Sequence, residues 1–425
     1  MEGCISNTIR IKSHPISKLD KKFRMQYLMG LAEFMYYINL KFDFAYIVFH
    51  VWYKGIDNEL PKSYWSGIPS FPRLHAAMKI KRKGLNFFRM RNVLLFDCLY
   101  LASLVDSTCF SYAETVLQTH LKGLFTRRVL KHIISNWNIL RETEGIPGEL
   151  IYHKRINANF KKSQLRRILV VATMSAGKST LINAMTGSKI NLVKSTACTD
   201  KLRCVYNKAG DDGITVRLSN GTYSYHYRAK TAYNTDFVDV GLPFRSNLSG
   251  RHLCFIDTPG TNYSKNPQHG IITRNAISQN NYDLVIIVVN GTQFNTDDED
   301  SLIDYTLAHT QKPVVFVVNQ LDRLNPEDDS IKDIIDDLKT KLIGKIKNPI
   351  IVPVSSYYAL LQRQETDLLT TDDVVQKKML SIKFKNTFYD FESYMHLNTR
   401  NFNNNAELRK TGIPILEEIL NNITK

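Results

Sequence analysis

The segment that decides the fold is Ala172-Thr-Met-Ser-Ala-Gly-Lys-Ser179. It fits the phosphate-loop pattern, with Ala172 in place of the first glycine. The short apolar run 168–171 precedes it and a helix-like stretch, 179–187, follows, which is the strand–loop–helix context that gives the pattern its meaning. The alternative is a glycine turn before a helix. We therefore expect a phosphate-binding loop near the start of an α/β domain.

The residue types in this loop suit a bound polyphosphate and a cation. Small side chains let backbone N–H groups point at phosphate oxygens, and the N-terminus of the following helix adds a partial positive charge. Lys178 is expected to reach the β- and γ-phosphates, and the Ser179 hydroxyl is expected to bind Mg²⁺. The residues expected to contact the ligand here are Met174, Ser175, Ala176, Gly177, Lys178, Ser179 and Thr180.

A second motif, Asp257-Thr-Pro-Gly260, closes the apolar run 253–256. An aspartate at a strand end can hold Mg²⁺ through water, and the N–H of Gly260 can sense a γ-phosphate. Turns often contain this pattern by chance, so its weight comes from its position after the phosphate loop.

A third motif, Asn319-Gln-Leu-Asp322, closes the apolar run 314–318. The Asp322 carboxylate can accept hydrogen bonds from N1–H and the exocyclic amine of guanine, an arrangement that adenine does not offer. Asn319 can hold the N7 side of the ring and the phosphate loop, whereas Gln320 stands where a lysine usually stacks on the base. Ser355 and Ser356, after the run 350–354, fit the last base-facing loop.

The fold class predicted from these patterns is α/β. The apolar runs at 168–171, 253–256, 284–289, 314–318 and 350–354 are short and continuous, as in parallel strands buried on both faces by helices. Helix-like stretches at 179–187, 298–309 and 328–346 separate most of them. The segments 202–205, 214–218 and 223–227 have turn signals between them and predict antiparallel strands at the sheet edge.

With these motifs in this order, the sequence resembles the translation-factor-like class of P-loop GTPases. Within that class, the stretch from Thr173 to Gly187 resembles the dynamin-like GTPases, particularly the bacterial ones. Ala197-Cys-Thr-Asp200 and the polar run Gln293–Asp300 add to the resemblance, which covers roughly residues 165–423. It implies GTP and GDP as ligands, Mg²⁺ as cofactor, GTP hydrolysis, and self-association through the GTPase domain. The alternative is a GTP-binding switch with little hydrolysis that recruits a protein or RNA partner.

The resemblance also implies roles for single residues. Thr199 resembles the switch I threonine that closes on Mg²⁺ and the γ-phosphate, with Thr196 as the alternative, so Lys178, Thr199 and Gly260 form the expected catalytic set. Ser175 lies where dynamins help to coordinate a monovalent cation. Thr261 replaces the catalytic glutamine of Ras-like enzymes and Met174 replaces the phosphate-loop glutamine of eukaryotic dynamins. Water positioning must then come from backbone, switch I or a partner subunit.

The front of the chain is basic and helical. Residues 1–167 hold 27 Lys/Arg and 12 Asp/Glu, a net of +15, whereas the remainder holds 29 and 28, a net of +1. We predict a basic helical region over 1–148, a basic linker helix over 149–166 and the GTPase domain over 167–425. The basic strip Arg73–Arg91 suits an anionic membrane surface. A nucleic acid is the less favoured partner, and a solvated lysine-rich helix face is the plain alternative.

Other features bound the cellular setting. The apolar segments 25–53 and 92–110 contain charged residues, so we expect buried or interfacial helices rather than membrane spans. The cysteines show no CxxC pair, which predicts reduced thiols in a cytoplasmic protein: Cys4, Cys98, Cys109, Cys198, Cys204 and Cys254. Peripheral membrane association is expected from the basic strip Arg73–Arg91 and from the dynamin-like resemblance. Thr411–Leu420 resembles the helix that closes a dynamin-type GTPase domain. A long insert (360–408) would then precede it, and no C-terminal stalk is evident.

Overall fold

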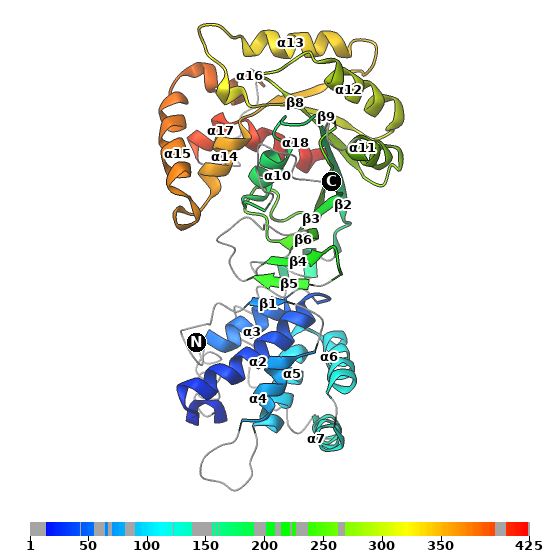
Figure 1. Cartoon of the computed structure of the whole chain (residues 1–425), viewed down its shortest axis with the longest axis vertical. Coiled ribbons are helices and arrows are strands. Elements are labelled where there is room, and N and C mark those ends of the chain that lie inside the picture. Colours follow the sequence, from blue (N-terminus) through cyan, green and yellow to red (C-terminus); the bar gives the residue numbers. More distant parts are fainter. Residues whose placement is uncertain are drawn as a thin grey trace. The chain divides into compact units, whose positions relative to one another are not determined.

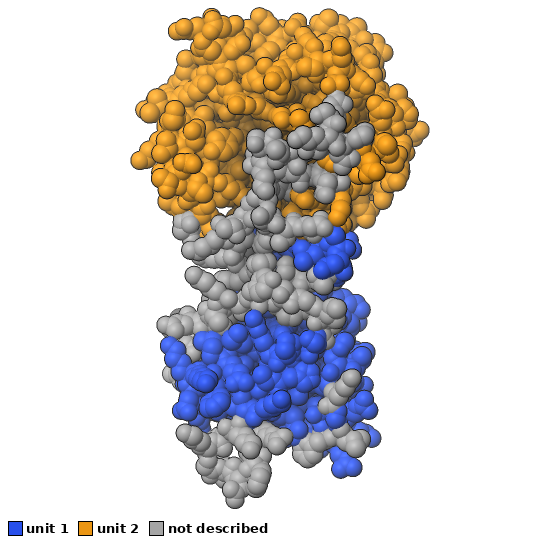
Figure 2. All heavy atoms as spheres, in the orientation of Figure 1, with its two compact units in different colours: residues 1–162, 208–228 blue, residues 163–207, 229–425 orange. Residues whose placement is uncertain are grey.

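The computed structural model describes residues 14–42, 44–54, 64–66, 70–80, 90–121, 123–137, 155–156, 158–160, 162–190, 201–208, 214–221, 223–226, 237–261, 268–395 and 405–423. Its contacts divide the chain into two compact units, coloured separately in Figure 2. Unit 1 comprises Met1–Lys162 and Lys208–Arg228, and unit 2 comprises Ser163–Asn207 and Ala229–Lys425. The segment 208–228, which lies within the predicted 167–425 domain, thus groups with the N-terminal helices. The predicted domain boundaries themselves stay predictions.

Unit 1 is mainly helical, as its apolar spacing indicates. After a short 3₁₀ helix, η1 (Pro15–Lys18), its helices are α2 (Lys21–Asn39), α3 (Ala45–Lys54), α4 (Pro72–Met78), α5 (Arg91–Val105), α6 (Ser107–His120) and α7 (Leu124–Ser135) (Figure 1). It also holds β1 (Tyr64–Ser66), β4 (Ile214–Leu218) and β5 (Tyr223–His226). β5 pairs antiparallel with both β1 and β4. The pairing of 214–218 with the next strand agrees with the sequence, whereas β1 lies in a turn-rich stretch that gave no strand signal.

Buried acidic side chains organise the core of unit 1. Glu33, 2% exposed, accepts hydrogen bonds from the backbone N–H groups of Arg73 and Leu74, each at 3.0 Å. These N–H groups belong to the first turn of α4 and have no partner within that helix. Asp97 accepts a hydrogen bond of 2.6 Å from the Tyr27 hydroxyl, and its Oδ2 lies 3.1 Å from Nε2 of His14. Both carboxyl groups are therefore satisfied inside the unit.

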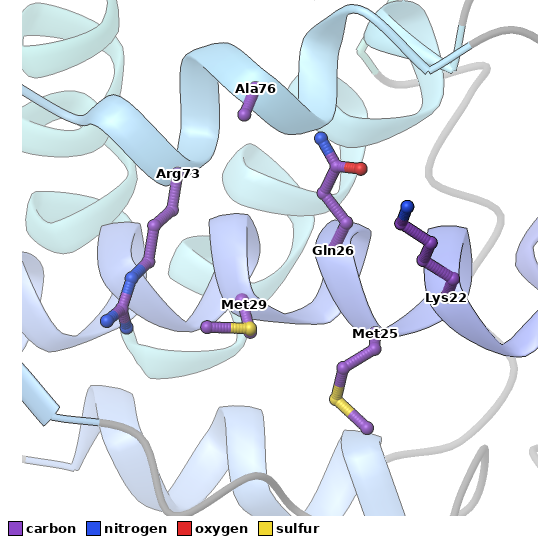
Figure 3. A pocket seen from close by; sticks show the side chains of 6 residues that line it. All are labelled: Lys22, Met25, Gln26, Met29, Arg73 and Ala76. Atoms are coloured by element: carbon purple, nitrogen blue, oxygen red, sulfur yellow. The ribbon is translucent and has the colours of Figure 1, made fainter.

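An open cavity of about 230 Å³ lies between α2 and α4. In Figure 3, Lys22 and Gln26 point from α2 towards α4, and Arg73 points from α4 towards α2. Met25, Met29 and Ala76 supply the apolar part of the lining. The cavity thus combines cationic groups with an adaptable apolar surface.

Unit 2 is built around a mostly parallel sheet with the strand order β6-β3-β7-β2-β8-β9-β10. Its strands are β2 (Arg166–Ala172), β3 (Arg203–Asn207), β6 (Phe237–Leu242), β7 (Leu253–Asp257), β8 (Leu284–Asn290), β9 (Val314–Asn319) and β10 (Ile350–Pro353). β7, β2, β8, β9 and β10 run parallel, and β3 is antiparallel to β7 but parallel to β6. The predicted α/β class and the predicted apolar strands are confirmed, whereas β6 was not foreseen.

Helices cover the central strands, which explains their continuous apolar runs. Every residue of β8 and β9 is buried. Side chains from β2, β8 and β9 pack in one core with α11 (Gln268–Ser278), α12 (Asp297–His309) and α13 (Ile331–Leu342). α10 (Lys178–Thr186) contacts β2, β7 and α14 (Ser356–Arg363). Because β7, β2, β8, β9 and β10 run parallel, their carboxyl ends lie at one edge of the sheet.

The long insert predicted at 360–408 is folded where the structure describes it. It contains η3 (Thr366–Leu368), α15 (Thr371–Lys383), η4 (Thr387–Tyr389), α16 (Phe391–Tyr394) and α17 (Ala406–Lys410), and α18 (Ile413–Ile423) follows. Thr370 and Asp373 form a capping box that starts α15. A buried ion pair joins Arg363 of α14 to Glu417 of α18. None of the helices in the described ranges is both long and apolar enough to span a bilayer.

Candidate functional site

The sequence motifs meet at the carboxyl edge of the unit 2 sheet. The loop 173–177 leaves β2, Asp257 ends β7, and Asn319 ends β9. Ser355 follows β10, which is the neighbour of β9. Strands that are distant in sequence thus deliver their polar ends to one place, which is where open parallel sheets usually bind ligands.

Two residues give the phosphate loop its shape. Ser175 and Gly177 both have positive φ angles, 65° and 86°, and Gly177 directly precedes α10. A Cβ atom on Gly177 would lie 2.3 Å from Nδ2 of Asn319, so this position needs glycine both for its conformation and for space. The third motif therefore packs directly against the phosphate loop at Gly177.

Lys178 and Asp257 form a buried ion pair at the loop. The Lys178 ammonium group donates to Oδ1 of Asp257, and the two side chains are 7% and 0% exposed. Each charge compensates the other, because a buried charge without a partner is costly. The half-buried Ser179 is the next residue of α10, and no hydrogen bond of its hydroxyl is found among the described residues. A polyphosphate can take Lys178 as its partner, while a divalent cation can take Asp257 and Ser179.

The turn at 257–261 is clamped against the phosphate loop. The N–H of Met174 donates to the Thr261 carbonyl at 3.1 Å, and the N–H of Thr261 donates to the Ala172 carbonyl at 3.2 Å. A Cβ atom on Gly260 would lie 3.2 Å from the Cα atom of Met174. This close approach favours glycine at 260 and holds the second motif in fixed register with the first.

Asn319 connects three parts of the site. Its Nδ2 donates to the carbonyl of Ala176 at 3.0 Å, and its Oδ1 accepts from the N–H of Ser356 at 3.2 Å. Both groups of the amide are thus used to hold the phosphate loop and the loop after β10 together. The hydrogen bond to Ala176 is the contact with the phosphate loop that was expected of Asn319.

Asp322 is held as a buried acceptor beside Ser355. Its residue is 9% exposed, and burial raises the pKa of its carboxyl group while a hydrogen bond from the Ser355 side chain opposes that rise. The Ser355 hydroxyl also accepts from the N–H of Tyr358 at 3.3 Å, which caps α14.

Gly412, with φ 73°, lies so close to Pro353 that a Cβ would be 2.0 Å from the Pro353 carbonyl oxygen.

The Gln320 side chain makes hydrogen bonds within the protein, whereas the lysine that usually stands at this position stacks on the base. Its backbone has φ 65°, and its Nε2 donates to the carbonyl of Ser175. Its Oε1 accepts from the Arg323 guanidinium at 2.8 Å. The side chain therefore bridges the phosphate loop and Arg323.

Residues 163–408 match the protein family described as "Elongation factor Tu GTP binding domain". The chain belongs to this family. It is therefore a GTP-binding P-loop protein of the GTP-hydrolysing kind, as the motifs predicted.

Individual relatives are more distant. The chain is similar to GTPase Era of Haemophilus influenzae (strain PittGG), with 29% identity over 199 residues, 46% of this chain and 51% of the relative. A similar match of 27% identity joins it to GTPase Era of Histophilus somni (strain 129Pt), covering 44% of this chain and 49% of the relative. The chain thus spans about half the length of the curated relatives that it matches. It is also similar to a solved oligomerised bacterial dynamin pair, at 15% identity and TM-score 0.36, covering 96% of this chain and 75% of that chain. This low TM-score supports no conclusion about function.

The GTPase fold brings most of the predicted residues together. The groups at 174–180, 257–260, 319–322 and 355–356 lie at one sheet edge, as described above. Thr199 and its alternative Thr196 lie outside the described residues. Ser356 contributes its backbone N–H to Asn319, and no partner of its buried hydroxyl is found in the described ranges.

One contributor to the site was missed by the sequence. Lys383, at the end of α15 in the insert, donates to the carbonyl oxygens of Asp322 at 2.6 Å and Leu324 at 3.1 Å. Its ammonium group also lies 4.8 Å from the centroid of the Tyr389 ring. Burial lowers the pKa of Lys383. The insert therefore braces the loop that carries Asp322, and no local pattern around Lys383 could have indicated this.

Proposed function

We propose that this chain is a dynamin-like GTPase whose unit 2 hydrolyses GTP with Mg²⁺ and whose nucleotide state controls self-association and contact with an anionic membrane surface. The observation that carries the nucleotide part is the joint placement of the Lys178–Asp257 pair and the Asp322–Ser355 pair on loops clamped by Asn319. The first pair suits a phosphate chain and a cation. The second suits the polar edge of a guanine.

The residues present fit Mg²⁺. This ion prefers oxygen ligands and usually keeps several waters, and the Ser179 hydroxyl and the Asp257 carboxylate supply such oxygens at the start of α10 and the end of β7. Thr199 is the proposed third contributor. The ion would neutralise charge on the phosphates. Lys178 would hold the β- and γ-phosphates, and the N–H of Gly260 would orient the γ-phosphate.

Guanine recognition is assigned to Asp322, with Asn319 on the N7 side of the base and Ser355 fixing the carboxylate. The Ser355 hydrogen bond favours the ionised carboxylate, which accepts both guanine donors. Because Gln320 is occupied by Ser175 and Arg323, it contributes less stacking than a lysine would. The residues proposed to bind GTP and GDP remain those at 174–180, 257, 260, 319, 320, 322, 355 and 356. Ser175 is the proposed contact for a monovalent cation.

Water activation is the weak point of the isolated site. Thr261 and Met174 stand where related enzymes use glutamine, and neither side chain can orient water as an amide does. We propose that a second GTPase domain completes the site. The turnover per enzyme should therefore rise with protein concentration. A turnover that stays flat across a concentration series would remove the self-association part of the proposal.

The membrane part rests on the charge and on the cavity of unit 1. Lys22 and Arg73 flank the methionines of the cavity between α2 and α4 (Figure 3), and the charge of Arg73 also acts on the buried carboxyl group of Glu33. The expected basic strip adds Lys79, while its part at 81–89 lies outside the described residues. Each basic residue near an anionic leaflet contributes about 1 kcal/mol. Cytoplasmic location with peripheral membrane binding follows as part of this proposal.

The test is co-sedimentation with vesicles containing phosphatidylserine, run with a GTP analogue, with GDP and without nucleotide. We expect pelleting that depends on the nucleotide and falls with salt. The matched control is the same vesicle without charged lipid. The variant Lys22→Glu/Arg73→Glu should pellet less while binding GTP normally. Pelleting that is equal in all three nucleotide states, or equally strong on neutral vesicles, would contradict the proposal.

An RNA partner is the second candidate, because the chain has 29% identity over 199 residues to GTPase Era, and Era has been solved in complex with nucleotides 1506–1542 of 16S ribosomal RNA. Basic side chains also suit phosphates of single strands or loops. Retention on RNA at a salt concentration that abolishes vesicle pelleting would favour this candidate. Vesicle pelleting that survives excess RNA would favour the membrane.

A further inference from the structure

Two cysteines lie side by side on neighbouring strands of unit 2. In the antiparallel register of β3 and β7, Tyr206 is opposite Cys254 and Cys204 is opposite Ile256. Side chains two positions apart on a strand point to the same face, so Cys204 and Cys254 are diagonal neighbours on one face of the sheet. The Cys254 thiol donates to the carbonyl oxygen of Phe255 at 3.8 Å, and the two neighbouring cysteines affect each other's pKa. Both cysteines are free thiols.

The two thiols have unequal surroundings. Cys204 is half-buried, whereas Cys254 is fully buried. Interaction with the neighbouring Cys254 thiol lowers the pKa of the Cys204 thiol, against the opposing effects of burial and of Asp239, its neighbour on β6. Interaction with Cys204, together with burial, raises the pKa of Cys254, while the charge of Arg167 on β2 opposes the rise. Cys204 thus combines partial exposure with a lowered pKa, whereas Cys254 is its fully buried neighbour.

We propose that Cys204 and Cys254 are a redox modification site at which a peroxide produces a reversible cross-strand disulfide. The Cys204 thiolate attacks one peroxide oxygen, the O–O bond breaks, and the departing hydroxide takes a proton to become water. Cys204 is then a sulfenic acid. The Cys254 sulfur loses its proton and attacks the Cys204 sulfur, the S–O bond breaks, and a second water leaves. The two thiols lose two electrons in total, and the peroxide gains them.

The other described cysteines provide an internal contrast. Cys98 and Cys109 are both fully buried, and they lie on α5 and α6 of unit 1. Burial, the largest cause, raises the pKa of Cys98 well above its ordinary value. A buried thiol with a raised pKa reacts slowly because the thiolate is the nucleophile. Cys4 and Cys198 lie outside the described residues, so the experiment has to separate them from the pair.

The experiment treats the full chain with hydrogen peroxide, blocks remaining thiols by alkylation, and maps the cysteine peptides by mass spectrometry. We expect a linked Cys204–Cys254 peptide that disappears on reduction by dithiothreitol. The variant Cys254→Ser should stop at a sulfenic acid on Cys204, which a dimedone probe traps. The variant Cys204→Ser should give neither the linkage nor a trapped sulfenic acid at Cys254. Cys109→Ser is the matched control and should form the linkage as the unchanged chain does.

A variant without Cys4 and Cys198 tests whether the pair acts alone, and the unchanged chain gives the same answer by peptide mapping if that variant fails to fold. GTP binding by each variant reports that unit 2 is folded. The proposal is overturned if Cys204 and Cys254 are still alkylated after peroxide treatment, or if Cys204 links to Cys198 instead. It is equally overturned if Cys254 is oxidised in Cys204→Ser. None of these outcomes depends on the proposed membrane or RNA partner.

Discussion

Buried charged side chains serve different purposes in the two units. In unit 1, Glu33 is satisfied by backbone N–H groups, which the fold fixes in place. In unit 2, Lys178 and Asp257 satisfy each other at a loop, and each can exchange that partner for a ligand. A buried charged group that accepts from backbone N–H groups stabilises the fold. A buried ion pair at a sheet edge instead keeps two charged side chains in place, where each can bind a ligand. Substitution of Lys178 or Asp322 should therefore change nucleotide affinity, whereas substitution of Glu33 should change stability and leave nucleotide affinity as it is.

The largest expected effect is on base specificity. Asp322→Asn replaces an acceptor by an amide that cannot accept both guanine donors, so we expect GTP affinity to fall about 1,000-fold, since unpaired polar edges are strongly rejected. Xanthosine triphosphate, which carries a carbonyl in place of the amine, should bind the variant better than it binds the unchanged chain. Titration with fluorescent nucleotides measures both affinities. The exposed control Asp336→Asn should change neither. Equal losses for both nucleotides would indicate unfolding instead of recognition.

The next effect is on phosphate binding. Lys178→Ala removes a charge-assisted contact to the phosphates, and we expect affinity for GTP to fall about 100-fold, corresponding to about 3 kcal/mol. Lys189→Ala is the control, because it breaks a partly exposed pair with Asp373 outside the loop and should change affinity by less than about 3-fold. Competition binding of GDP and GTP measures the change. If the two lysine variants lost affinity equally, the special role of Lys178 would be lost.

A pH effect is expected for Glu299, a buried carboxyl group of unit 2 at the start of α12. Burial raises the pKa of Glu299 from 4.5 to about 7, although the N–H groups of Asn290 and Asn295 and the charge of Lys341 oppose this, and Asp300 adds to it. A raised carboxyl pKa means that the folded chain binds more protons, so this group's contribution to stability is full below pH 4.5 and is lost as the pH rises to about 7.

Glu299→Gln resembles the protonated side chain. Relative to the unchanged chain, its free energy of unfolding should therefore rise by about 2.5 kcal/mol between pH 5 and pH 8. Urea unfolding of both chains across this range measures the difference. Asp298→Asn, at the exposed neighbouring position, should show no such slope. A difference that stays constant with pH would show that Glu299 is not held in an unfavourable charged form.

The smallest expected effect lies in unit 1. Glu33→Ala leaves the N–H groups of Arg73 and Leu74 without their acceptor, and we expect the free energy of unfolding of unit 1 to fall by about 2 kcal/mol. GTP affinity should stay the same. Calorimetry and nucleotide titration check the two halves of this expectation, with Glu114→Ala on α6 as the control. A loss of GTP binding would break the contrast between the units.

The phosphate loop, Asp257, Asn319 and Asp322 could be predicted because each belongs to a short motif that ends an apolar strand. Lys383 could not, since it reaches Asp322 from a helix whose position depends on tertiary packing. The Cys204–Cys254 pair was missed for a similar reason. Cysteine spacing in the sequence reveals CxxC pairs, but only the register of β3 and β7 brings these two together. The grouping of 208–228 with the N-terminal helices likewise depends on contacts between distant segments.

The segment 208–228 belongs to unit 1 although it lies between two segments of unit 2 in the sequence, and this affects the order in which the units can fold during synthesis. A ribosome produces β1 early, but the strand that pairs with it, β5, emerges only after β2 and β3 of the GTPase unit. Cotranslational folding usually completes the N-terminal domain first. Here the helices of unit 1 can collapse early, but the unit lacks β4 and β5 until these strands have been synthesised, after β2 and β3 of unit 2. A fragment cut at residue 162 would lack β4 and β5 and expose the edge of β1 to chaperones and proteases.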